Sequence, residues 1–250
     1  FFPDDQPSPH NSFDDEVAYL KAHFPEGDPY IFGPRSCDHH YYFVYYTRQP
    51  NPYAGTNVDP GAWIASDRHQ TLEILMTGMN REVMEQFYMS DKFVSSQETT
   101  KSTGIQSLFT DETLVDAHQF KPLGYSMNGL DDQIYYTIHI TPQPECSFVS
   151  FETNLVIKDY PSLVQRVVDV FQPECFTVLL VRDGVNEEKG SSYSGFYARN
   201  HAHHNFKGSH HHLSFFSFRR HGKLQNSHRP LPVRENVTIA TPINPFADVS

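Results

Sequence analysis

Short segments with helical spacing of apolar residues alternate along the chain with segments of strand character. The strongest helical pattern covers residues 161–171, where apolar residues recur on one side and Pro161 occupies the first turn. Asp14 and Asp15 precede a second segment with helical spacing. Further helices are expected over residues 81–88, opened by Asn80, and near residues 105–109.

β-Branched and aromatic residues dominate the segments that we expect to be strands. We place Asn128-Gly129 in the connection before the strand that begins at Ile134, and short turns of this kind join antiparallel strands. The expected class is α+β, an antiparallel β-sheet with helices on one face. The expected strands are residues 41–47, 63–66, 71–76, 113–118, 134–140, 147–152, 176–181 and 213–218.

Composition narrows the class of protein and its partners. The chain has 250 residues, of which 38% are hydrophobic, and this is enough for a packed core. A formal net charge of −11 argues against nucleic acid, which is bound through clustered Lys and Arg. No apolar run is long enough to cross a membrane, and three cysteines without metal-type spacing are typical of a reducing compartment. We therefore expect a cytoplasmic protein with no nucleic-acid or membrane partner.

Histidines gather in the carboxy-terminal third of the chain, and imidazole is a common ligand of transition metals. No cysteine or acidic residue lies close by at a fixed spacing, so we assign no metal site and expect a polar surface. We interpret Cys37-Asp38-His39-His40 as the turn before the strand at residue 41. The gathered histidines are His201, His203, His204, His210, His211 and His212.

Several stretches resemble the eukaryotic, pyruvoyl-dependent S-adenosylmethionine decarboxylase family in order and spacing. The similarity extends from about residue 10 to about residue 182 and resumes at residues 213–218. The resemblance implies a four-layer αββα sandwich of two similar halves. We then expect residues 1–66 to be a remnant of the first half, 67–218 the second half, and 219–250 an irregular tail. The matching stretches are Gln70-Thr-Leu-Glu-Ile-Leu-Met76, Phe120-Lys-Pro-Leu-Gly-Tyr-Ser-Met-Asn-Gly129, Tyr136-Thr-Ile-His-Ile-Thr-Pro142 and Phe148-Val-Ser-Phe-Glu-Thr-Asn154.

The resemblance implies decarboxylation of S-adenosylmethionine to the aminopropyl donor for spermidine and spermine synthesis. Decarboxylation leaves a carbanion that no ordinary side chain delocalises, and the family uses a pyruvoyl group, which forms a Schiff base with the substrate. The family makes this group by self-cleavage of a proenzyme at a serine in a Glu-Ser-Ser segment. We find no equivalent segment in these 250 residues. We therefore expect the carboxy-terminal part of a longer proenzyme, inactive by itself.

The resemblance also assigns roles around the reacting group. Phe120 matches the aromatic residue that stacks on the adenine of S-adenosylmethionine, and Gln143 stands where the family binds the ribose hydroxyls with a glutamate. Ser126 and His139 match the pair that assists self-cleavage. The alternative for Phe120 is a core phenylalanine. From the pattern alone, Ser126 and His139 would be ordinary sheet residues.

A second group matches the site where putrescine activates animal enzymes of the family. Thr71 and Glu73 lie on one strand face, and Glu152 is a second carboxylate, whereas His69 replaces an aspartate. Buried carboxylates are natural partners of a diamine. The alternative is that these carboxylates are ordinary strand residues whose charges face solvent. The substitution at His69 leaves putrescine activation open.

Three functions remain open at this point. The chain is part of a decarboxylase, or a truncated relative without catalysis that binds and regulates a full-length decarboxylase, or a small-molecule binding module. The expected partners are S-adenosylmethionine, putrescine, and either a second copy of the chain or a full-length relative.

Overall fold

The computed structural model describes residues 7–33, 42–47, 70–89, 95–144, 146–183, 191–206, 209, 211–222 and 241–242. The strand expected at 63–66 and the segment Cys37-Asp38-His39-His40 lie outside the described residues. Within the described part, no helix is both long and apolar enough to span a membrane.

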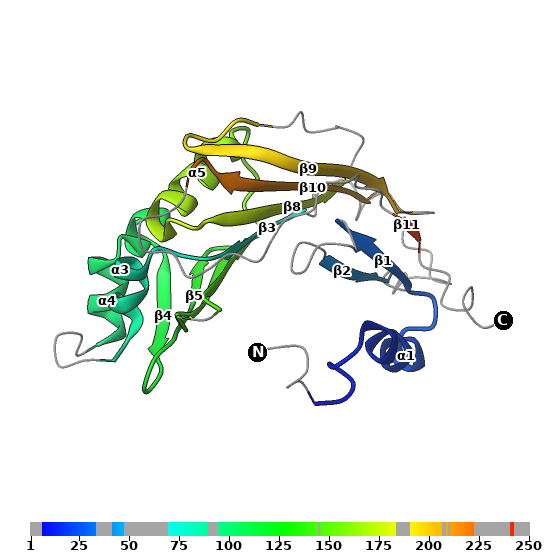
Figure 1. Ribbon diagram of the computed structural model, residues 1–250, viewed down its shortest axis with the longest axis horizontal. Coiled ribbons are helices and arrows are strands. Elements are labelled where there is room, and N and C mark those ends of the chain that lie inside the picture. Colours follow the sequence, from blue (N-terminus) through cyan, green and yellow to red (C-terminus); the bar gives the residue numbers. More distant parts are fainter. Residues whose placement is uncertain are drawn as a thin grey trace.

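A large antiparallel sheet of eight strands forms the centre of the structure (Figure 1). Its strand order is β4-β5-β6-β7-β3-β8-β10-β9, so β4 and β9 are its two edges. The strands are β3 (Gln70–Thr77), β4 (Leu114–Gln119), β5 (Tyr125–Asp131), β6 (Ile134–Thr141), β7 (Phe148–Thr153), β8 (Cys175–Asp183), β9 (Phe196–Asn205) and β10 (His211–Arg220).

Helices cover one face of this sheet. The longest of them is α5 (Tyr160–Phe171), whose first turn contains Pro161 and whose N-cap Asp159 accepts a hydrogen bond from the Ser162 amide. The shorter elements are α3 (Arg81–Met84), which continues as the 3-10 helix η2 (Glu85–Phe87), α4 (Ser96–Ser102), and the 3-10 helix η3 (Ile105–Leu108).

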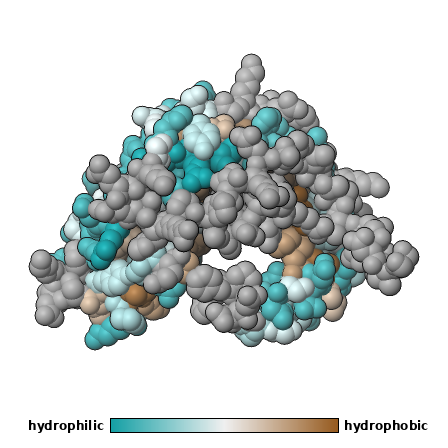
Figure 2. Space-filling model, in the orientation of Figure 1, coloured by the Kyte–Doolittle hydropathy of each residue, from teal (hydrophilic) through white to brown (hydrophobic). Residues whose placement is uncertain are grey.

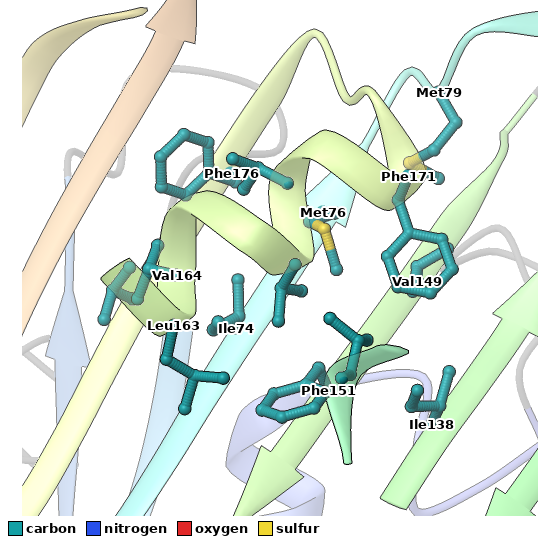
Figure 3. Packing of buried hydrophobic residues seen from close by; sticks show 14 of the residues in the cluster. Ile74, Met76, Met79, Ile138, Val149, Phe151, Leu163, Val164, Phe171 and Phe176 are labelled. Atoms are coloured by element: carbon teal, nitrogen blue, oxygen red, sulfur yellow. The ribbon is translucent and has the colours of Figure 1, made fainter. Parts of the chain in front are cut away.

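The main hydrophobic core lies between α5 and the sheet (Figure 3). Phe171 and Val164 of α5 are fully buried against Ile74 and Met76 of β3 and Phe151 of β7. Because strand side chains alternate between faces, burial of these residues turns their neighbours in the sequence to the opposite face of the sheet.

A small sheet covers part of that opposite face. It contains β1 (Asp28–Phe32), β2 (Tyr42–Tyr46) and β11 (Thr241–Pro242) in the order β11-β1-β2. Phe32 and Phe215 pack in a second hydrophobic cluster between the sheets, where Tyr46 also stacks on Phe206 with ring centroids 3.9 Å apart.

Helix α1 (Phe13–His23) forms the last layer, since Phe13 stacks on the outward-facing Phe43 of β2. The layers therefore run helix, sheet, sheet, helix, and the expected α+β class with helices on one face is confirmed. Figure 2 shows a hollow between the part of the surface that contains β4 and β5 and the part that contains α1 and β2.

The prediction for Asn128-Gly129 is wrong. Both residues lie inside β5, and the chain reverses at Asp132, which has a left-handed φ of 50°. A Cβ at Gly129 would come within 3.1 Å of the Thr113 methyl group, so a larger residue there would require that neighbour to shift. The Asn-Gly pair was therefore a misleading turn signal.

The prediction of an irregular region after residue 218 also needs correction. Arg219 and Arg220 still belong to β10, and Thr241–Pro242 pairs with β1 as β11. Strand β11 pairs with β1 through backbone hydrogen bonds, which do not require apolar side chains. The composition of this segment therefore did not predict a strand.

Candidate functional site

A hydroxyl and an imidazole meet on the face of the large sheet opposite the helices. Ser126 on β5 lies directly opposite His139 on β6, and Ser126 Oγ is 2.8 Å from His139 Nδ1. On the other face, the buried neighbours Tyr125 and Met127 hold the strand around Ser126 in place, and Ile138 and Ile140 do the same around His139. The sheet register thus brings a hydroxyl within hydrogen-bond reach of a base.

Phe120 lies in the tight connection between β4 and β5. Its amide donates to the carbonyl of Gly124 (2.9 Å), and the Gly124 amide donates to the carbonyl of Phe87 (3.0 Å). Gly124 has a φ of 117°, a conformation that favours glycine. The Phe120 side chain is 47% exposed, so the alternative of a core phenylalanine is wrong.

Gln143 is exposed in the connection between β6 and β7. It lines a cavity of about 390 Å³ together with Met84 of α3 and with Tyr88. The Cys146 thiol donates to Gln143 Oε1 at 3.4 Å. Phe120 follows the end of β4, and Gln143 follows the end of β6, which places both at the same end of the large sheet.

Two carboxylates face each other further along the same sheet face. Glu73 on β3 lies directly opposite Glu152 on β7. Burial raises the pKa of Glu73 to about 7, and the nearby charge of Glu152 adds to the rise. Tyr135 donates a 2.6 Å hydrogen bond to Glu152 and is also hydrogen bonded to Thr71. The structure thus brings together Thr71, Glu73 and Glu152.

His69 lies outside the described residues, whereas Tyr135 is a member of this group that sequence reasoning missed. The pKa of the Tyr135 hydroxyl is raised to about 12 by burial and by its hydrogen bond to Glu152. Strand alternation was the signal for Tyr135, because it lies on the same face of β6 as His139.

The raised pKa of Glu73 predicts how stability depends on pH. Between about pH 4.5 and about pH 7, the folded protein keeps a proton that the unfolded chain has released, so the free energy of unfolding falls as pH rises through this window. A glutamine side chain carries no charge at any pH. Glu73→Gln is therefore expected to raise the free energy of unfolding by on the order of 2 kcal/mol at about pH 8 and by much less at about pH 5. Thermal unfolding at both pH values measures the difference.

Glu112→Gln is the matched control for that experiment, because it removes an exposed carboxylate from the turn before β4. An equal stabilisation by Glu73→Gln at both pH values would contradict the raised pKa.

The carboxy-terminal histidines lie on β9 and β10. His211 contacts Asp183 (3.1 Å) and Tyr46 (2.7 Å), and His203 stacks on His212. His210 lies outside the described residues. Among the residues that the structure describes, no three His, Cys, Asp or Glu side chains are arranged to hold a metal ion.

Comparisons with known proteins agree on one family. The model of a family described as adenosylmethionine decarboxylase matches residues 1–223. The S-adenosylmethionine decarboxylase proenzyme of Xenopus laevis is 41% identical over 179 residues, which is 71% of this chain and 49% of that protein. The proenzyme of Dictyostelium discoideum is 37% identical over 196 residues, 78% of this chain and 47% of that protein. The chain therefore spans about half the length of the curated relatives it matches.

The fold has a counterpart among solved structures. The Trypanosoma brucei AdoMetDC-delta26 monomer matches with a TM-score of 0.62 and 24% identity, over 89% of this chain and 81% of that one. This likeness supports the layered arrangement of sheets and helices described above.

Proposed function

The chain belongs to the adenosylmethionine decarboxylase family, and we propose that it forms part of an enzyme that decarboxylates S-adenosylmethionine to the aminopropyl donor for spermidine and spermine. The 2.8 Å contact between Ser126 and His139 carries the proposal, because it sets a hydroxyl beside a base on a face that the helices leave open. Residues outside these 250 contribute the rest of the activity in this account.

Ser126 and His139 have distinct roles in self-cleavage. The Ser126 hydroxyl donates a hydrogen bond to the oxygen that becomes negative when a side-chain hydroxyl attacks the backbone. His139 acts as the base that removes a proton, and the loss of this proton leads to β-elimination. Their mutual hydrogen bond fixes the direction of the imidazole.

The same two side chains suit a pyruvoyl group. A hydroxyl and an imidazole N–H are donors that a keto and an amide oxygen accept, and the sheet face around Ser126 and His139 is partly open. When present, this group supplies the electron-accepting carbonyl that decarboxylation needs. Ser126 and His139 would hold the oxygens of the pyruvoyl group and so keep the group in one orientation.

Phe120 and Gln143 are proposed to bind the nucleoside part of the substrate. The exposed ring of Phe120 offers a stacking surface for adenine, and the cationic sulfonium of the substrate favours an aromatic neighbourhood. Gln143 offers an amide oxygen to a ribose hydroxyl, without the charge of a glutamate.

A diamine such as putrescine is proposed to bind at Thr71, Glu73, Glu152 and Tyr135. These residues present oxygen acceptors on one face, and a bound ammonium group would favour the ionised form of Glu73. We also propose that residues 1–66 and 67–218 derive from the two halves of the family sandwich, since β1 and β2 lie in the small sheet and β3 to β10 form the large one. A cytoplasmic location and pairing with a second copy or a full-length relative complete the proposal.

The intact masses of all chains in the protein purified from its source test the proposal. We expect two chains, the larger beginning with a pyruvoyl group and containing Ser126 and His139. A single uncleaved chain would contradict it and would favour a relative without catalysis.

A further inference from the structure

A second histidine lies on the other side of Ser126. His118 on the edge strand β4 is directly opposite Ser126, just as His139 is on β6. The side chains of His118, Ser126 and His139 therefore form one row across three strands on the face opposite the helices. His118 is exposed, and neither the core nor the self-cleavage chemistry described above uses it.

His118 also contacts the Phe120 ring. The two ring centroids are 4.7 Å apart and the ring planes meet at 66°, which is an edge-to-face contact. The contact joins the Ser126–His139 pair to the proposed adenine platform, because His118 is next to both.

The backbone of Phe120 is fixed, but its ring needs a side-chain neighbour to set its direction. The hydrogen bond to Gly124 holds the main chain. His118 contacts the ring itself. An exposed phenylalanine without such a contact would sample several rotamers and lose entropy on stacking.

We propose that His118 is a positioning residue that holds the Phe120 ring in the orientation that stacks on the purine of S-adenosylmethionine. This inference rests on the proposed function and adds a residue to its binding surface. In this role His118 acts through its edge-to-face ring contact with Phe120.

Steady-state kinetics test this role. They compare the wild-type protein with His118 variants, each produced in the source in full. His118→Ala is expected to raise the KM for S-adenosylmethionine about three- to tenfold with kcat unchanged, because it removes ground-state binding only. His118→Phe restores a ring and is expected to return KM to within about twofold of the wild-type value. An unchanged KM in His118→Ala overturns the inference, and so does an equal defect in His118→Phe.

His221→Ala is the matched control. His221 is also exposed and also contacts an aromatic ring, that of Tyr197, with centroids 5.2 Å apart, but it follows β10 near the other edge of the sheet. It is expected to leave KM and kcat unchanged.

Binding of 5′-deoxy-5′-methylthioadenosine, measured by calorimetry, separates this inference from the decarboxylase proposal. If the wild-type protein releases no CO2, the decarboxylase proposal fails, yet weaker nucleoside binding by His118→Ala than by His118→Phe still supports the role of His118. Equal binding by the two variants, or no binding by the wild-type protein, overturns it.

Discussion

Replacement of His139 by alanine is expected to slow self-cleavage, and with it CO2 release from S-adenosylmethionine, by about 10²- to 10⁴-fold. Alanine removes the base proposed for β-elimination, and it leaves the Ser126 hydroxyl, 2.8 Å from the imidazole, without its partner. Gel electrophoresis follows cleavage of the protein as its source produces it, and labelled CO2 follows catalysis.

The double variant Ser126→Ala/His139→Ala sharpens this prediction. Because the two side chains act as one unit, the double variant is expected to be about as slow as the slower single variant. His221→Ala controls for loss of an exposed histidine elsewhere on the sheet. Retention of more than about a tenth of the wild-type cleavage rate by His139→Ala would contradict the role of the imidazole.

Replacement of Phe171 by alanine is expected to lower the free energy of unfolding by about 3–5 kcal/mol. Phe171 is fully buried at the end of α5, in the core between this helix and the large sheet (Figure 3). The truncation leaves a cavity that the rigid sheet cannot fill. Urea unfolding followed by circular dichroism measures the loss.

Phe24→Ala is the matched control, because the Phe24 side chain is 48% exposed at the end of α1. We expect it to change the free energy of unfolding by no more than about 0.5 kcal/mol. Similar losses for Phe171→Ala and Phe24→Ala would mean that the α5 core does not dominate stability.

Elements with strong periodicity could be predicted from the sequence. Helix α5 was expected because its apolar residues recur on one side behind Pro161, and β6 because isoleucines alternate with His139. In such elements, burial on one face imposes a period of 3.6 or 2 on the sequence. Strands β8 and β10 were also expected, although they are buried on both faces, because they are rich in apolar residues.

Elements without that pattern were missed. Strand β9 is a sheet edge whose outward residues are mostly polar, and only a few residues, such as Ala202 and Phe196, are buried. Helix α4 consists almost entirely of polar residues, with Thr99 and Thr100 as its buried side chains. Strand β1 is short and contains Pro29, and one of its two partners, β11, comes from a distant part of the chain.

In the candidate site too, some residues were indicated beforehand and others were missed. Resemblance indicated Ser126, His139 and Glu73, but their contacts depend on strand register, which the sequence did not give. Tyr135 and His118 were missed because no matching motif named them. Their contacts with Glu152 and Phe120 became visible only once the strands were paired.

Release of CO2 from carboxyl-labelled S-adenosylmethionine by the protein purified from its source tests the central claim most directly. We predict release that is abolished by a carbonyl-trapping reagent such as phenylhydrazine and slowed at least about 10²-fold by His139→Ala. Purified protein that binds S-adenosylmethionine without releasing CO2, or that releases none under any condition, would contradict the claim that this chain is part of a decarboxylase.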